Sequence, residues 1–362
     1  MTTKKAFSSS KKHHESQAVI FSAVWAIVAF ILGIIIYGDR YVPLFGHDSV
    51  GLTSALLAMV ASGSVSFWGL YTQHPRVAEL RALKSSKVGL IRRWIKVFSL
   101  TFVIAMLGFL LTSIVFFVIQ QAFQGVTFDT YASAVASATA AGIASYTSYL
   151  VAVTMTPMIL SSLLALFLVS GVLSSAISNS DPNWWEYHFS SLGSGGSLSA
   201  GAFNITLIIA GLVIWVLAGI LAGDLYELQR QQKTIYPRRI KVFHWSLVAI
   251  GVALAMVGAF VYDVHVTIHN SSAGSMAIVF LALVTALPYI VPNLTKAFYG
   301  FSYSMLAALA VAVYLFYGTG YFNLTAFELV AAAIIFTWLV VLVRQIAAQL
   351  NDTGDDEIHL TA

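Results

Sequence analysis

Long apolar stretches alternate with short polar segments along most of the chain. Nine stretches of roughly twenty residues carry almost no charge, and an α-helix needs about this length to cross a bilayer. They lie at 18–37, 51–71, 97–119, 150–178, 198–223, 244–262, 273–291, 298–318 and 326–349. The pattern predicts an all-α fold, a polytopic transmembrane helical bundle.

The segment 131–149 is a candidate for a tenth crossing. It contains Ala, Ser, Thr and Gly without any charge, so hydropathy alone does not decide. Lys and Arg near helix ends stay in the cytoplasm. If the segment crosses, Arg40 is the only one of the 19 basic residues outside; if it does not, seven more move outside. We therefore expect about ten helices with both termini cytoplasmic, against the alternative of a re-entrant or surface-lying segment.

The small residues of this weak segment predict where it packs. Ala134, Ala138, Gly142 and Ser145 would allow a close approach of neighbouring backbones, which is how helices associate in lipid. We expect the segment to be buried against other helices instead of facing acyl chains.

Composition supports the membrane class. Hydrophobic residues make up 59% of the chain and charged residues 9%, and the mean hydropathy is +0.84. A soluble domain carries about 25% charged residues, so lipid must surround most of this chain. The absence of cysteine excludes disulfides and thiolate chemistry and suits the bacterial cytoplasmic membrane. The apolar run at 19–37 is long enough to be a retained first helix.

The basic residues gather in the predicted inner loops. The segment 76–96 mixes seven Lys and Arg with apolar positions and predicts an amphipathic helix on anionic lipids. Neutralising lipid phosphates explains this charge, so no nucleic-acid partner is expected. The segment 352–357 is acidic and is expected to be disordered.

Three predicted outer segments hold the candidate chemistry: 180–196, 262–270 and the first outer loop with Asp39, Arg40, His47 and Asp48. His265 and His269 are spaced i, i+4, which places both imidazoles on one face of a helix. Asp263 or His188 could complete a zinc site with an open position for water, and Ser191 or Glu186 could move protons.

A simpler interpretation needs no cofactor. The same polar residues would cap helix ends and form hydrogen bonds at the water boundary. Trp184 and Trp185 fit an aromatic belt at the interface, or a platform that stacks on a carbohydrate or a lipid head group. No cofactor is predicted apart from this candidate zinc ion.

Charge inside the helices is sparse. Glu328 and Asp224 lie near helix ends, where an interfacial position is expected. Pro157 and Pro288 are the interior helix breakers, and the two halves show no convincing inverted repeat. A small-molecule transporter is therefore the third interpretation of the chain.

Short motifs in the second half resemble a bacterial family. The motifs are Ser191-Leu192-Gly193, then Phe203-Asn204 at the start of an apolar helix, then a loop with His269 and, less closely, His265. The stretch is similar to the membrane proteins of domain of unknown function 998, which have six helices and a polar first outer loop. The resemblance implies an extracytoplasmic loop at 179–197 and counterparts for Ser191, Gly193, Asn204 and His269. Distant relatives by topology imply a lipid-related role.

The resemblance divides the chain into three parts. Residues 1–147 form an N-terminal four-helix membrane extension, 148–350 a six-helix domain, and 351–362 an acidic cytoplasmic tail. Two functions are predicted: an envelope protein that recognises a lipid head group, a glycan carrier or a protein partner at its outer face, or a metal-dependent lipid hydrolase. Outer-face pocket candidates are Trp184, Trp185, Glu186, Ser191 and Asn204.

Overall fold

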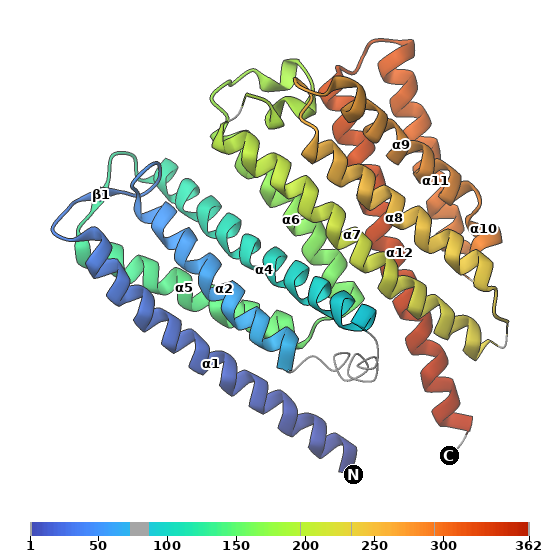
Figure 1. Cartoon of the computed structure of the whole chain (residues 1–362), viewed down its shortest axis with the longest axis horizontal. Helices are drawn as coiled ribbons and strands as arrows, with labels where there is room; N and C mark the ends of the chain where they lie inside the picture. The colour runs from blue at the N-terminus through green and yellow to red at the C-terminus, as the bar shows by residue number, and fades with distance from the viewer. Residues whose placement is uncertain (1, 73–86, 196, 233, 293, 361–362) are drawn as a thin grey trace. The chain divides into compact units, whose positions relative to one another are not determined.

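The structure, a computed structural model, describes residues 2–72, 87–195, 197–232, 234–292 and 294–360. In these residues, nine helices are long and apolar enough to cross a membrane. Another helix, α5 (Thr130–Val153), has a similar length but a less hydrophobic composition. The chain forms two compact units, unit 1 (Met1–Met155) and unit 2 (Thr156–Ala362) (Figure 1). The all-α, polytopic membrane fold is confirmed.

The described residues of unit 1 form four long helices. They are α1 (Thr2–Tyr37), α2 (Val50–Thr72), α4 (Lys87–Ala122) and α5. The α1–α2 and α4–α5 connections meet at one end, where β1 (Val42–Pro43) pairs antiparallel with β2 (Thr127–Phe128). Successive helices of the unit therefore run in alternating directions between two ends.

The helix α5 packs along the whole apolar length of α1. At one end Thr130 donates a hydrogen bond to the carbonyl of Gly38, and at the other Tyr149 donates one to Gln17. Between them, a Cβ atom at Gly33 would lie 2.8 Å from Ala134 Cα, so these backbones are in close contact. The segment thus forms a membrane-length helix buried against its neighbours, as its small residues predict, and not a re-entrant loop.

Hydroxyl groups join the helices inside unit 1. Ser137 lies 2.8 Å from the Tyr37 hydroxyl and 2.9 Å from the Ser54 hydroxyl, and all three side chains are buried. Ser22 donates to the carbonyl of Gly142 across 2.9 Å. Small polar residues can enter a membrane helix of low hydropathy because they find such partners on adjacent helices.

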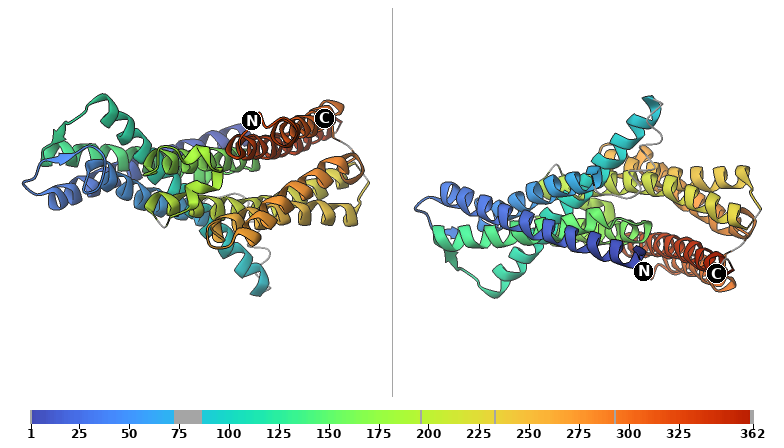
Figure 2. Two further views of the ribbon diagram at one scale, coloured as in Figure 1. Left: turned by 90° about the horizontal axis from the view of Figure 1, so that it is seen from above. Right: turned by 90° about the horizontal axis from the view of Figure 1, so that it is seen from below.

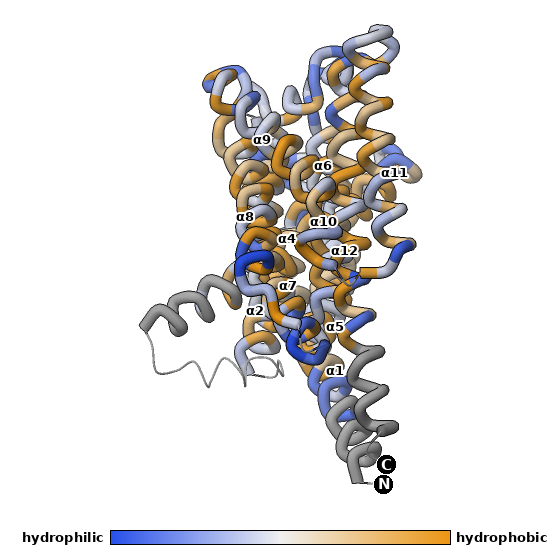
Figure 3. The backbone as a smooth tube through the Cα atoms, turned by 90° about the vertical axis from the view of Figure 1, so that its right-hand side faces the viewer, coloured by the Kyte–Doolittle hydropathy of each residue, from blue (hydrophilic) through white to orange (hydrophobic). Residues whose placement is uncertain are grey.

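Unit 2 contains six long helices and several short turns. The long helices are α6 (Pro157–Ser178), α7 (Leu198–Gln231), α8 (Pro237–Ala259), α9 (Val266–Thr285), α11 (Lys296–Val313) and α12 (Leu324–Leu360). The short elements are η1 (Trp184–Glu186), η2 (Phe189–Gly193), α10 (Leu287–Ile290) and the π-helical turn η3 (Tyr314–Gly318). Hydrophobic residues predominate along the helices, and hydrophilic residues gather in the connections (Figure 3).

The helices α7 and α8 approach each other closely at paired glycines. A Cβ atom at Gly211 would lie 2.3 Å from the carbonyl oxygen of Gly251, and one at Gly251 would lie 2.6 Å from that of Gly211. Glycine is required on both helices because any side chain would push the backbones apart. Figures 1 and 2 show the two helices side by side.

Three boundaries differ from the expected ones. The span predicted at 150–178 begins later, because α5 continues to Val153 and Pro157 starts α6 with Thr156 as its cap. The units accordingly divide after Met155 and not after residue 147. The helix α12 extends to Leu360, so the acidic segment expected to be disordered is helical. Extending an existing helix is less costly than starting one.

The predicted amphipathic segment lies only partly within the described structure. Residues 76–86 fall outside the described residues. Residues 87–96 form the beginning of α4, which continues without a break into its apolar span.

Candidate functional site

Three connections meet at one end of unit 2, and we call them together the cap. They are residues 179–197 between α6 and α7, residues 260–265 between α8 and α9, and residues 319–323 before α12. The first connection holds the two turns η1 and η2. Figure 1 shows this connection folded over one end of the unit's helices.

The turn η2 is fixed by side chains from two distant helices. The Phe189 amide donates a 2.6 Å hydrogen bond to the Glu328 carboxylate of α12, and the Ser190 amide also interacts with this carboxylate. The Ser190 hydroxyl lies 3.0 Å from His269 Nε2 of α9. The position of the connection is therefore set by tertiary contacts more than by its own sequence.

The hydrogen bonds of His269 define its tautomer. Its side chain is 3% exposed, and Nδ1 lies 2.8 Å from the carbonyl oxygen of Phe260. A carbonyl can only accept a hydrogen bond, so Nδ1 carries the proton and donates it. In the neutral ring Nε2 then accepts the hydroxyl proton of Ser190. Neutral His269 thus satisfies both partners at once.

The side-chain amides of two asparagines hold the rest of the connection. Asn204 of α7 donates to the carbonyl of Gly193 across 2.9 Å, because an amide just inside a membrane helix needs such a partner. A Cβ atom at Gly193 would lie 2.3 Å from Asn204 Oδ1, so the bond requires glycine at this position. Asn323 donates to the carbonyl of Trp185 across 3.0 Å, while its Oδ1 accepts from Ala326 and caps α12.

His188 is half-buried between the first two connections of the cap. Its ring centroid lies 4.1 Å from that of Tyr262, and Tyr262 contacts the ring of His269 edge-on. Burial lowers the pKa of His188 below its ordinary value of 6.5; the nearby Asp263 carboxylate opposes this shift, and His269 adds to it. The neutral form of His188 is therefore favoured in the folded cap.

The structure does not bring the four predicted zinc ligands together. The helix α9 begins at Val266, so His265 lies before it and contacts Phe260, while both nitrogens of His269 have other partners. Asp263 is exposed. Among the described residues, no group of three or more His, Cys, Asp or Glu side chains could hold a metal ion. The i, i+4 spacing predicted one helix through both histidines, but α9 begins after His265.

The outward surface of the cap is aromatic and acidic. Trp185, Tyr187 and Tyr321 are 50%, 60% and 78% exposed, while Trp184 is half-buried. The carboxylates of Asp181, Glu186 and Asp263 are also on exposed residues. The three connections contain no Lys or Arg in their sequence. Such a surface attracts neutral or positively charged groups and repels anions.

Ser191 and the first loop of unit 1 have local structural partners. The Ser191 hydroxyl donates to the carbonyl of Trp184 across 3.0 Å and so ties η1 to η2. In unit 1, Arg40 donates to the carbonyl of Ile36 across 2.7 Å at the end of α1, and His47 pairs with Asp48 at 3.2 Å in an exposed contact.

Several residues of the site were not singled out from the sequence as parts of the cap. Ser190 and Tyr262 take their roles from contacts with segments far away in the chain, which no local pattern indicates. Asn323 could have been found, because an Asn before an apolar run is a typical helix cap. Glu328 was noted only as an acid near a helix end.

No family model matches the chain, and no curated protein or solved structure shows significant similarity to it. The resemblance to domain of unknown function 998 therefore stays a prediction.

Proposed function

We propose that the chain is a multi-pass protein of the bacterial cytoplasmic membrane whose cap recognises a head group bearing hydroxyls or an ammonium. The observation that carries the proposal is the exposed pair Trp185 and Tyr187, flanked by carboxylates on a connection that four helices hold in place. Ser175 of α6 completes this support by donating to the carbonyl of Leu192 in the connection across 3.4 Å. Binding to a preformed surface avoids the entropy cost of ordering a loop.

The distribution of charge supports an outward-facing cap. The described basic residues of unit 2 lie in helices and connections toward the opposite end, which we call the basic end. They are Arg230, Arg238, Arg239, Lys241, Lys296 and Arg344. At this end, Arg239 at the start of α8 donates to the carbonyl of Tyr289 in the short helix α10 across 2.9 Å. Basic ends of membrane helices stay in the cytoplasm.

The chemistry of the cap favours a sugar or an amine over a phosphate alone. Aromatic faces stack on the apolar faces of sugars and attract ammonium groups, and carboxylates bind both hydroxyls and ammonium. An isolated anion would meet three acidic residues and no basic one in the cap.

The proposal is tested by thermal unfolding of the detergent-purified protein with soluble head groups. We expect glucosamine or phosphoethanolamine to raise the unfolding temperature and glycerol phosphate to leave it unchanged. Trp185→Ala should abolish the shift, whereas Trp245→Ala, an exposed Trp on α8, should preserve it. A shift that survives Trp185→Ala, or a response to glycerol phosphate alone, would contradict the proposal.

The pair formed by Ser190 and His269 favours a second function, a metal-free acyl hydrolase. A serine hydroxyl that donates to a histidine, itself oriented by a third group, is the arrangement of an activated nucleophile. Ser190 Oγ would attack an ester carbonyl, its proton would move to His269 Nε2, and that proton would then leave with the alcohol. Ser190 is only 7% exposed, and Glu328 occupies the amides that could stabilise an oxyanion. Recognition is therefore the better-supported function.

A fluorophosphonate probe separates the two functions. Labelling of the wild type that disappears in Ser190→Ala, but persists in Ser191→Ala, would establish the hydrolase. We expect no labelling of Ser190, because its hydroxyl is covered.

A further inference from the structure

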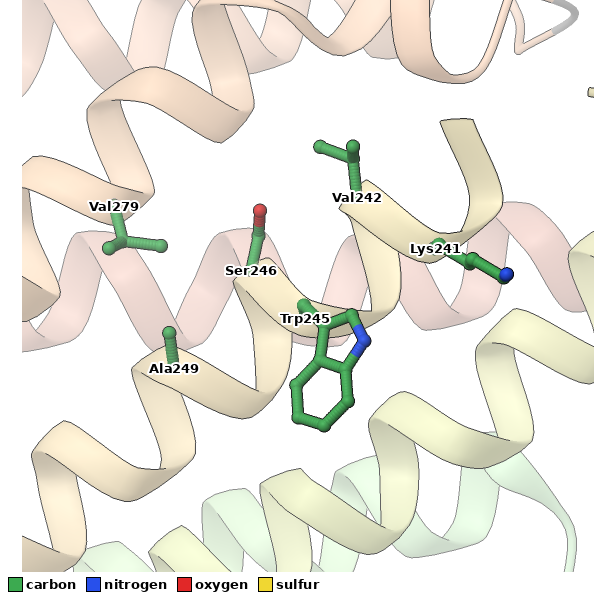
Figure 4. Close-up of a pocket in the computed structure, with 6 residues that line it drawn as sticks. All are labelled: Lys241, Val242, Trp245, Ser246, Ala249 and Val279. Atoms are coloured by element: carbon green, nitrogen blue, oxygen red, sulfur yellow. The ribbon is translucent and has the colours of Figure 1, made fainter. Parts of the chain in front are cut away.

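A groove runs along the outside of unit 2 between α8 and α9, away from the cap. Its volume is about 420 Å³, and it is lined by Lys241, Val242, Trp245, Ser246, Ala249 and Val279 (Figure 4). Five of these residues lie on α8 and one on α9. The groove is therefore a feature of two adjacent membrane helices in one unit.

The groove is apolar over most of its length and basic at one end. Lys241 lies at one end of the row of lining residues, and Ala249 and Val279 lie at the other (Figure 4). Eight residues of α-helix separate Lys241 from Ala249, a rise of about 12 Å. Val242 is 52% exposed and Trp245 is 63% exposed, so no other part of the described structure fills the groove. Its apolar wall lies along the membrane-spanning parts of α8 and α9, at the level of the lipid acyl chains.

Lys241 has no hydrogen-bond, ion-pair or cation–π partner within the described residues, in contrast to Arg239 and Arg230. Arg239 stacks on the rings of Tyr236 and Tyr289, at 4.2 and 4.0 Å, and Arg230 pairs with Glu227 at 3.4 Å. No carboxylate in the described part of the chain pairs with the Lys241 ammonium. Lys241 therefore offers a positive charge at the point where the apolar groove reaches the basic end.

We propose that this groove binds one anionic phospholipid from the leaflet at the basic end. The acyl chain packs on Val242, Ala249 and Val279, and the phosphate interacts with the Lys241 ammonium. Trp245 lies at the level of the interface, where tryptophan is enriched. The charge on Lys241 selects an anionic head group, and the apolar wall distinguishes a lipid from a free phosphate. The inference concerns a site separate from the cap and does not depend on the function proposed for the cap.

Native mass spectrometry of the full chain in mild detergent tests the site. Phosphatidylglycerol and phosphatidylcholine with identical acyl chains are added separately, and the retained lipid is measured. We expect the wild type to retain phosphatidylglycerol more strongly, and Lys241→Gln to lower this retention about fivefold. Ala249→Phe, which fills the apolar part, should lower the retention of both lipids.

Matched variants separate a site from general attraction to a basic surface. Lys296→Gln removes an exposed charge from the start of α11, and Ala307→Phe enlarges an exposed position on the same helix. Both should retain the lipids as the wild type does. Unchanged retention in Lys241→Gln or Ala249→Phe, or an equal loss in either control, would overturn the proposal. The unfolding temperature of each variant checks that it is folded.

Discussion

At the scale of single residues, the cap depends on side chains that bind two partners each. His269 donates to the carbonyl of Phe260 and accepts from Ser190, and Asn323 caps α12 while it holds the carbonyl of Trp185. Each side chain therefore joins a connection to a helix. Removing one of them leaves two groups without a partner, and buried polar groups without partners are costly.

The two histidines at i, i+4 spacing should differ strongly on substitution. His269→Ala leaves the Phe260 carbonyl and the Ser190 hydroxyl unpaired, and we expect it to lower the free energy of unfolding by about 2–4 kcal/mol. His265→Ala, at an exposed position, should change it by less than about 0.5 kcal/mol. Thermal and denaturant unfolding in detergent measure both, and equal effects would contradict the hydrogen-bonding role of His269.

His188 should make the stability of the cap depend on pH. Its pKa is lower in the folded cap than in the unfolded chain, so the unfolded chain binds more protons as the pH falls. The stabilisation by neutral His188 is fully present above pH 6.5, the ordinary value, and is lost as the pH falls toward the lowered pKa. Asp263, His269 and Tyr262 are the titratable groups around this ring.

We therefore expect the unfolding temperature to fall between about pH 7.5 and about pH 5.5, and to fall less in His188→Phe. The phenyl ring keeps the contact with Tyr262 without taking up a proton. His265→Phe serves as the control and should retain the full pH dependence. An identical pH dependence in the wild type and in His188→Phe would exclude His188 as its source.

At the scale of elements, the positions of the helices can be predicted from the lengths of the apolar stretches, but the contacts between the helices cannot. The weak segment at 131–149 is a helix because Tyr37, Ser54 and Ser137 satisfy one another and because Gly33 admits Ala134. Charge counting favoured a membrane helix at this segment, whereas hydropathy did not decide. The i, i+4 spacing would place His265 and His269 on one face only if both residues were inside the same helix. His265 lies one residue before the start of α9, and helix boundaries are the least reliable feature of such patterns.

The close contact of α7 and α8 gives a prediction at the same scale. Gly251→Leu places a side chain where the carbonyl oxygen of Gly211 would be 2.6 Å from its Cβ atom, so the helices must separate. We expect a loss of about 1–3 kcal/mol in the free energy of unfolding. Gly219→Leu is the control, because a Cβ atom there meets no neighbouring atom within 4 Å. Equal unfolding temperatures of the two variants would show that the contact is not close.

At the scale of the whole molecule, each unit is a set of membrane helices with its own ends. In unit 2 the aromatic and acidic cap and the basic end lie at opposite ends of the helices, so the two ends differ in charge. This asymmetry could be predicted from the sequence, because the three connections of the cap contain no Lys or Arg. The hydrogen bonds of Glu328 and His269 could not be predicted from the sequence, because they join residues far apart in the chain. The proposed recognition at the cap and the proposed lipid binding in the groove both depend on this difference between the two ends of the unit.

The proposed orientation of unit 2 can be measured directly from the side of the membrane on which each of its two ends lies. The chain has no cysteine, so single-cysteine variants can be labelled without background. Glu186→Cys reports on the cap and Thr234→Cys on the basic end, and both positions are exposed. We expect a membrane-impermeant maleimide to label Glu186→Cys in intact cells and to label Thr234→Cys only after the membrane is opened. Labelling of Thr234→Cys in intact cells, with Glu186→Cys protected, would contradict the proposed orientation.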